Sequence, residues 1–177
     1  MSSYSVAFYT EAGTKRGMGH LLRCYTIYEE FKQNNHHTFF HLDSDISFDY
    51  KFNDIKYFKY KDLDFSKKLD LIFIDSYEAS IEVYQKLAKN CKLIVCIDDY
   101  ARLSYPQGVI INFAPQSQEL FSKTHSVNHT YLLGLSYVPI RKQFLQVQTP
   151  KKDKQLFIML GGGDIGANLS IDILETQ

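Results

Sequence analysis

The segment GMGHLLR at residues 17–23 combines two glycines, a histidine and an arginine in a spacing that suits chemistry on a phosphate-bearing ligand. It follows an apolar strand pattern and opens a helical one, so Gly17 and Gly19 allow close backbone approach to a ligand. A helix N-terminus offers unpaired N–H groups and a positive dipole end to an anion. The same field favours neutral imidazole, so His20 is a candidate general base, and Arg23 is expected to reach a phosphate or a carboxylate. The alternative is a tight turn that His20 merely caps, since neither GxxxxGK[ST] nor GxGxxG is matched.

Acidic residues come directly after two buried strand patterns further along the chain. Asp75 follows LIFI at 71–74, and Asp98 and Asp99 follow LIVCI at 93–97. Parallel sheets bind ligands at the carboxyl ends of their strands, so these carboxylates are expected beside the glycine-rich turn. Helix capping and turn formation are the alternative roles for both groups.

Nucleophilic and metal chemistry have weaker support in the pattern. Cys24 lies four residues after His20, which allows a Cys–His pair, but a small buried helix residue is the simpler interpretation. His36, His37 and His41 have no carboxylate or cysteine at ligand spacing. We therefore expect no metal site and no cofactor.

Two further polar turns are candidates for ligand binding. Asp43-Ser44-Asp45 matches the DxD tripeptide that holds a divalent metal in some nucleotide-sugar transferases, although an ordinary polar turn is the simpler interpretation. Gly161, Gly162 and Asp164 follow one strand pattern and precede a helical one, which makes them a second candidate for anion binding.

The elements that must position these residues alternate between strand and helix. Near-continuous apolar strands separated by helical periods predict an α/β fold with a Rossmann-like parallel sheet and helices on both faces. The expected strands are residues 5–9, 38–42, 71–74, 93–97 and 109–112, and the expected helices are residues 20–32 and 79–90.

The domain organisation follows from a change in composition near residue 146. Residues 1–145 are expected to form the Rossmann-like domain that carries His20, and the polar stretch 146–155 to form a linker. Residues 156–177 then give one strand and one helix, which is too little to bury the faces of a second sheet. We interpret them as the start of an incomplete second Rossmann-like domain.

Composition excludes several classes of protein. The 177 residues are 45% hydrophobic and 23% charged, which excludes extensive disorder. The formal net charge is zero, so no global basic field attracts nucleic acid or an anionic membrane. No apolar run approaches a membrane span and the N-terminus does not resemble a signal peptide. Three cysteines without a framework favour a reducing cytoplasm.

Six short motifs occur in an order that strongly resembles one family over essentially the whole chain. That family is the UDP-2,4-diacetamido-2,4,6-trideoxy-β-L-altropyranose hydrolases of pseudaminic acid biosynthesis. The motifs are Gly17-x-Gly19-His20-x-x-Arg23, Ile74-Asp75-x-Tyr77, Asp98-Asp99, Ile111-Asn112, Gly134-x-x-Tyr137-x-x-x-Arg141 and Gly161-Gly162-x-Asp164.

The resemblance implies a GT-B-like pair of Rossmann-like domains with a UDP-sugar between them, and a monomer when complete. It implies metal-independent hydrolysis in which water attacks the anomeric carbon and the configuration inverts. His20 would activate the water and Tyr77 would position the sugar or the water. The glycine turn would lie near the diphosphate or the sugar, and Asn112, Tyr137 and Arg141 match family positions whose roles spacing does not give.

The chain departs from the family at several places. Tyr9 and Glu11 stand where a basic residue and an aspartate are common, and Gly163 replaces a Ser or Thr. Most of the second domain is also missing from the sequence. Two alternatives therefore remain: a GT-B-like glycosyltransferase that uses a sugar or lipid acceptor, and a non-catalytic fragment that binds a nucleotide-sugar.

Overall fold

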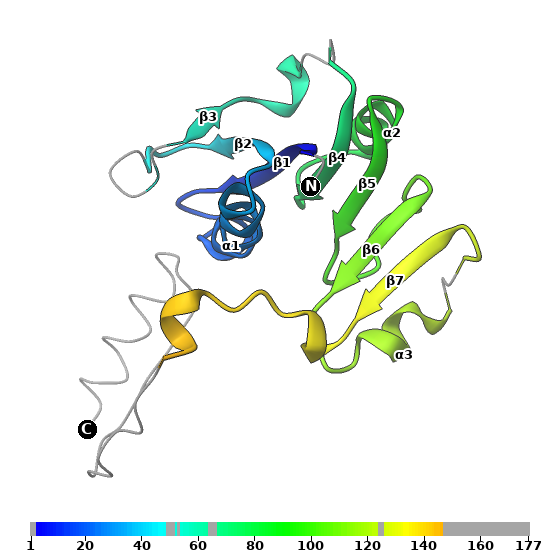
Figure 1. The fold of residues 1–177 in the computed structure, drawn as a ribbon. Coiled ribbons are helices and arrows are strands. Elements are labelled where there is room, and N and C mark those ends of the chain that lie inside the picture. The colour runs from blue at the N-terminus through cyan, green and yellow to red at the C-terminus, as the bar shows by residue number, and fades with distance from the viewer. Residues whose placement is uncertain (1–2, 49–51, 53, 64–66, 124–125, 147–177) are drawn as a thin grey trace, which may run out of the picture.

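The computed structural model describes residues 3–48, 52, 54–63, 67–123 and 126–146. Within these ranges, seven parallel strands form one sheet in the order β3-β2-β1-β4-β5-β6-β7 (Figure 1). The strands are β1 (Ser5–Ala12), β2 (His37–Ser44), β3 (Ile55–Tyr57), β4 (Leu69–Asp75), β5 (Cys91–Ile97), β6 (Gly108–Asn112) and β7 (His129–Leu133). The helices are α1 (Gly19–Gln33), α2 (Ile81–Lys89) and α3 (Ser117–Ser122), with short 3₁₀ helices at Tyr60–Asp62, Leu135–Tyr137 and Lys142–Phe144.

This arrangement confirms the predicted α/β class and the Rossmann-like parallel sheet. The predicted helices 20–32 and 79–90 correspond to α1 and α2, with ends that differ by one or two residues. The prediction missed β3 and β7, which form the two edges of the sheet. Edge strands are partly exposed, so they lack the continuous apolar run by which the inner strands were identified.

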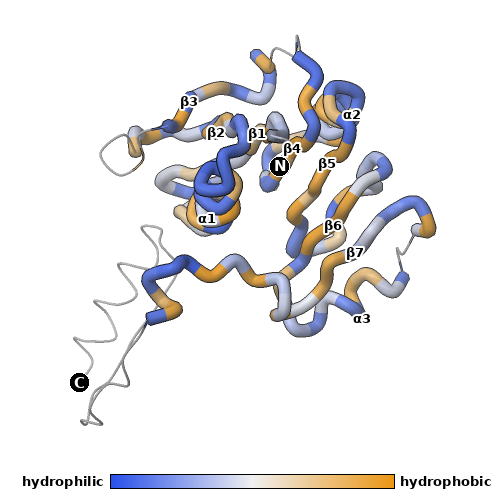
Figure 2. The backbone as a smooth tube through the Cα atoms, in the orientation of Figure 1, coloured by the Kyte–Doolittle hydropathy of each residue, from blue (hydrophilic) through white to orange (hydrophobic). Residues whose placement is uncertain are grey.

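Strand β1 shows how the two hydrophobic layers form. Its side chains alternate, so Val6 and Phe8 pack against α1 while Ala7 and Tyr9 face the layer that contains α2 and α3. Hydrophobic residues run along the central strands, and hydrophilic residues are concentrated on the outer parts of the helices (Figure 2). The sheet is therefore buried on both faces over its middle strands.

The chain changes direction across the sheet between β1 and β4. From β1 it passes through α1 to β2 on one side, and from β4 it passes through α2 to β5 on the other side, with the two helices on opposite faces. At such a switch point the connections diverge and leave a crevice at the carboxyl ends of the strands. The residues that end β1 and β4 are thus placed where this class of fold binds ligands.

Most of the predicted linker and all of the predicted second-domain start, residues 156–177, lie outside the described residues. None of the described helices has the length and apolar character needed to cross a membrane.

Candidate functional site

The glycine-rich turn places His20 at the carboxyl edge of the sheet. Gly13 and Gly17 exchange backbone hydrogen bonds of 3.1 and 2.8 Å, and both have positive φ, at 153° and 67°. A Cβ on Gly13 would lie 1.7 Å from a carboxylate oxygen of Asp45, which accepts hydrogen bonds from the backbone N and hydroxyl of Thr14. Only glycine fits at Gly13, so the turn closes tightly and His20 falls in the first turn of α1.

Among the residues that the structure describes, no side chain accepts a hydrogen bond from the first backbone N–H groups of α1. Met18 is its N-cap residue and makes no side-chain capping hydrogen bond. A Cβ built on Gly19 would meet nothing within 4 Å, so open space lies beside the first turn. Unpaired N–H groups and the dipole of a 15-residue helix favour an anion in that space.

His20 is held by Asp75, which ends β4 on the α1 side of the sheet. The imidazole Nδ1 lies 2.7 Å from Oδ1 of Asp75, and both side chains are buried. Asp75 is kept ionised: burial opposes its charged form, but hydrogen bonds from Arg23 and His20 outweigh burial and lower its pKa. An ionised carboxylate only accepts, so the neutral tautomer that suits this contact has its proton on Nδ1 and its lone pair on Nε2. Within the described residues, no hydrogen bond to Nε2 is present.

Arg23 joins the two carboxylates that follow β4 and β5. Its Nε and Nη2 lie 2.5 and 2.7 Å from the oxygens of Asp75, and its Nη1 lies 2.9 Å from Asp99. Burial disfavours the guanidinium charge, yet the hydrogen bond and charge of Asp75 raise the pKa of Arg23 above its ordinary value. Nη2 also lies 3.0 Å from Nδ1 of His20, a contact between two donors that their shared acceptor Asp75 imposes. Of the two sequence-based roles for Arg23, the structure shows carboxylate pairing.

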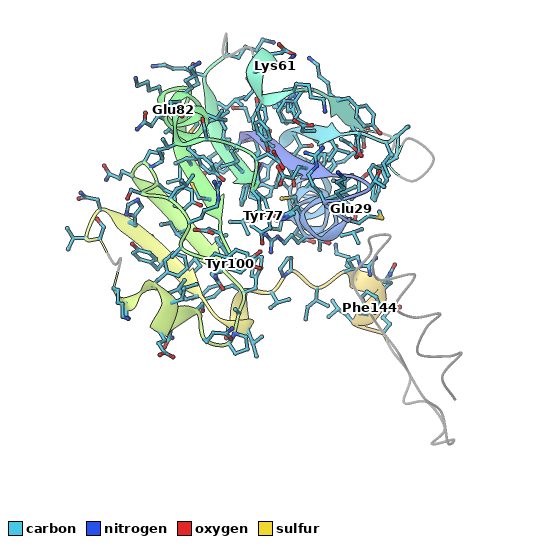
Figure 3. All side chains as sticks on the ribbon, turned by 180° about the vertical axis from the view of Figure 1, so that it is seen from behind. Glu29, Lys61, Tyr77, Glu82, Tyr100 and Phe144 are labelled. Atoms are coloured by element: carbon cyan, nitrogen blue, oxygen red, sulfur yellow. The ribbon has the colours of Figure 1, made fainter. Side chains whose placement is uncertain are left out.

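Tyr77 completes the cluster. Its hydroxyl donates to Asp99 at 2.8 Å, and its ring meets that of His20 edge to face with centroids 4.4 Å apart. Burial and the hydrogen bond to Asp99 raise the pKa of Tyr77 well above its ordinary value, so it acts as a hydrogen-bond donor rather than a base. Tyr77 lies next to Tyr100, whose ring centroid is 5.6 Å away and whose side chain is exposed (Figure 3). The pair forms the solvent-facing rim of the cluster.

The predicted residues Asp98 and Asn112, at the carboxyl ends of β5 and β6, have their side chains bonded to the backbone. Asp98 accepts from the N–H groups of Tyr100 and Arg102 at 3.0 and 2.8 Å. Asn112 donates to the carbonyl of Asp98 at 2.8 Å and accepts from the N–H of Ala114 at 2.7 Å. Both are buried, so their evident role is to shape the loops that follow β5 and β6.

Tyr137 and Arg141 lie on the segment that follows β7. Tyr137 is exposed, and the Arg141 guanidinium lies 4.6 Å from the ring centroid of Phe144. The structure does not bring either into the His20 cluster by a hydrogen bond or ring contact. Gly161, Gly162 and Asp164 lie outside the described residues.

The other candidate residues, Cys24 and Asp43, make contacts within the fold. Cys24 is fully buried, its thiol lies 3.6 Å from Asp75, and burial raises its pKa, which opposes a thiolate nucleophile. Asp43 pairs with Lys59 at 2.6 Å and with Arg16 at 3.4 Å. Among the residues that the structure describes, no group of three or more His, Cys, Asp or Glu side chains is arranged to hold a metal ion.

Glu11 is the residue that sequence reasoning placed only as a departure from a family pattern. It is 1% exposed and accepts from the backbone N–H of Tyr77 at 2.8 Å. The strand alternation that puts Ala7 and Tyr9 on the inner α2 face also puts Glu11 there. A charged residue that alternates with buried apolar residues along a strand was therefore the sequence pattern that could have indicated a role for Glu11.

No protein-family model and no curated protein sequence matches this chain. The function is therefore argued from the cluster formed by His20, Arg23, Asp75, Tyr77 and Asp99.

Proposed function

We propose that this chain is the first domain of a GT-B-like enzyme that hydrolyses a UDP-linked 2,4-diacetamido-2,4,6-trideoxy sugar with inversion and without a metal, in pseudaminic acid biosynthesis. The observation that carries the proposal is the hydrogen bond from His20 Nδ1 to ionised Asp75, which leaves Nε2 as a proton acceptor. The motif resemblance supplies the substrate class.

In the proposed reaction, His20 Nε2 takes a proton from a water molecule as the water oxygen bonds to the anomeric carbon. The bond between that carbon and the UDP oxygen breaks, and its electron pair leaves with UDP. Asp75 stabilises the imidazolium that forms, as a carboxylate does for histidine in other hydrolases. The proton then passes to solvent, which restores the base for the next turnover.

The diphosphate needs positive potential, which the carboxylates of the cluster do not provide. Two carboxylates, Asp75 and Asp99, share one guanidinium, so the charged part of the cluster is negative when His20 is neutral. The open space beside Gly19 and the uncapped first turn of α1 are the better site for a diphosphate. In the proposed complex the leaving group therefore binds at the helix end and the water lies at His20.

The test is a proton NMR time course of the chain with the UDP-linked diacetamido sugar, in buffer with a chelator. We expect release of UDP and free sugar of inverted configuration. In water enriched in ¹⁸O, UDP should contain no ¹⁸O because the broken bond is the carbon–oxygen bond. His20→Ala should lower turnover by about 10²- to 10⁴-fold, the usual contribution of a general base.

The matched control is His37→Ala, which removes an exposed histidine from the start of β2. It should hydrolyse the substrate like the wild type. Unchanged turnover in His20→Ala, with its fold intact, would sink the proposal. Turnover that requires a sugar or lipid acceptor would favour the glycosyltransferase, and broadened substrate lines without turnover would favour a binding fragment.

A further inference from the structure

The side chain of Glu11 accepts hydrogen bonds from the loop that carries Tyr77. One carboxylate oxygen accepts from the N–H of Tyr77 at 2.8 Å, and the other accepts from the hydroxyl of Ser76 and, at 3.4 Å, from the N–H of Glu78. These donors occupy three consecutive residues immediately after β4. Glu11 itself is on β1, so these hydrogen bonds connect the two strands on either side of the switch point.

The carbonyl groups of the same loop are held from the other direction. Arg102 donates through Nη2 to the carbonyls of Ser76 and Ala79 at 3.0 and 3.1 Å. The Tyr84 hydroxyl also donates to the Ser76 carbonyl at 3.2 Å. The Ser76 hydroxyl, itself bonded to Glu11, also accepts from the N–H groups of Glu78 and Ala79 at 3.0 and 2.9 Å. Because Glu11 binds the N–H of Tyr77 and Arg102 binds the carbonyls on either side, the loop has little freedom to shift the backbone of Tyr77.

We propose that Glu11 is a positioning residue that sets Tyr77 against His20 and Asp99. Glu11 lies on the α2 face of the sheet, whereas Asp75 lies on the α1 face with Phe73, so Glu11 acts on the cluster through the Tyr77 backbone. The geometric part of this inference stands on the contacts alone. Its kinetic part rests on the proposed hydrolase function.

The carboxylate is suited to this role because it only accepts hydrogen bonds. Glu11→Gln keeps the shape and retains one acceptor for the Tyr77 N–H, but its amide NH₂ group then faces the donors of Ser76 and Glu78. Glu11→Asp keeps both acceptors and is one methylene too short to reach all three donors. Asp70→Asn is the matched control, because Asp70 accepts comparable hydrogen bonds at the other end of the pair formed by β1 and β4. It accepts from the backbone N and the hydroxyl of Ser5, each at 2.8 Å.

The experiment compares these variants by NMR of the His20 ring and by kcat and KM for the UDP-sugar. We expect Glu11→Gln to move the His20 ring resonances towards those of Tyr77→Leu, which lacks the neighbouring ring. We expect its kcat to fall about tenfold to a hundredfold, with KM changed less than kcat, since small misplacements of this kind cost up to about a hundredfold. Asp70→Asn should keep the wild-type resonances and kcat.

Wild-type His20 resonances and kcat in a folded Glu11→Gln would overturn the inference, as would equal changes in Asp70→Asn. If Glu11→Gln does not fold, Glu11→Asp, which is too short to reach all three donors, is judged by the same two measurements. If the wild-type protein hydrolyses no UDP-sugar, the proposed function fails, and the His20 resonances alone decide the role of Glu11.

Discussion

The two ends of the sheet differ in what they bury. The nine buried polar or charged side chains of the described residues all lie at or just beyond the carboxyl ends of strands, and they are Thr10, Glu11, His20, Asp43, Asp75, Ser76, Asp98, Asn112 and Ser117. At the amino end, Asp70 pairs with Lys92, whose side chain is 82% exposed. Buried polar groups stabilise a fold only when each is satisfied by a partner. Seven of the nine side chains have hydrogen-bond or ion-pair partners, whereas the hydroxyl oxygens of Thr10 and Ser117 have no hydrogen-bond partner among the described residues. The carboxyl end therefore holds a buried polar network, and the polar contacts of Asp70 at the amino end are more exposed.

The two ends of the sheet should differ most in the free energy of unfolding that is lost when one carboxylate is removed from each. Asp75→Ala leaves the mostly buried Arg23 with Asp99 as its remaining partner, and breaking a buried pair costs about 3–5 kcal/mol. Asp70→Ala should cost clearly less, because solvent replaces its partners. The free energy of unfolding in urea measures both, and equal losses would contradict the contrast between the two ends.

The loss of stability between pH 6.5 and 4 should also arise in the carboxyl half. His41 lies near the end of β2 with its ring stacked on Tyr9, and burial, helped by the charge of Lys56, lowers its pKa to about 4. Between pH 6.5 and 4 the unfolded chain therefore binds a proton that the folded protein rejects. The contribution of His41 to the free energy of unfolding is complete above pH 6.5. It is lost as the pH falls through 4, by up to about 3 kcal/mol.

His41→Phe tests this assignment because it retains a ring against Tyr9 and does not titrate. Urea unfolding of both proteins at pH 7 and pH 4 should show a smaller loss in the variant. An identical loss in the two proteins would place the titration elsewhere.

Packing at the amino end is tested at Gly108, the first residue of β6. A Cβ there would lie 2.4 Å from the backbone oxygen of Ile94 and 2.7 Å from its Cγ2 atom. Neither neighbour has room to yield, so Gly108→Ala should cost about 1–3 kcal/mol. Thermal unfolding gives the measurement, and an unchanged midpoint would show that the strands separate more easily than their contacts indicate.

The smallest change in stability is expected at Gly19 on the opposite edge. Its added Cβ meets nothing, and alanine is the better helix former, so Gly19→Ala should leave stability unchanged or raise it by up to about 1 kcal/mol. Under the proposed function the same methyl group enters the space for the diphosphate, so KM should rise. Lower stability would show that the space at Gly19 is not open.

Strand-end reasoning predicted part of this site and missed the rest for physical reasons. It placed His20 and Asp75 at one edge, because both follow strands that run in the same direction. It left open the partner of Arg23, since Asp75 and Asp99 lie 52 and 76 residues away and only the fold sets their distance. It did not assign a role to Glu11, because its hydrogen-bond partners lie on the loop after β4, 65 to 67 residues away in the chain.

The position of β1 in the middle of the sheet has a consequence during protein synthesis. His20 emerges from the ribosome 55 residues before Asp75, and Arg23 emerges 76 residues before Asp99. Until β4 and β5 have been translated, His20 and Arg23 on α1 lack their carboxylate partners Asp75 and Asp99. Parallel pairing between distant segments is slow, so this interval exposes β1 and β2 to wrong partners. A translational pause once residue 99 has emerged from the ribosome would give the nascent chain time to assemble the cluster before β6 joins the sheet.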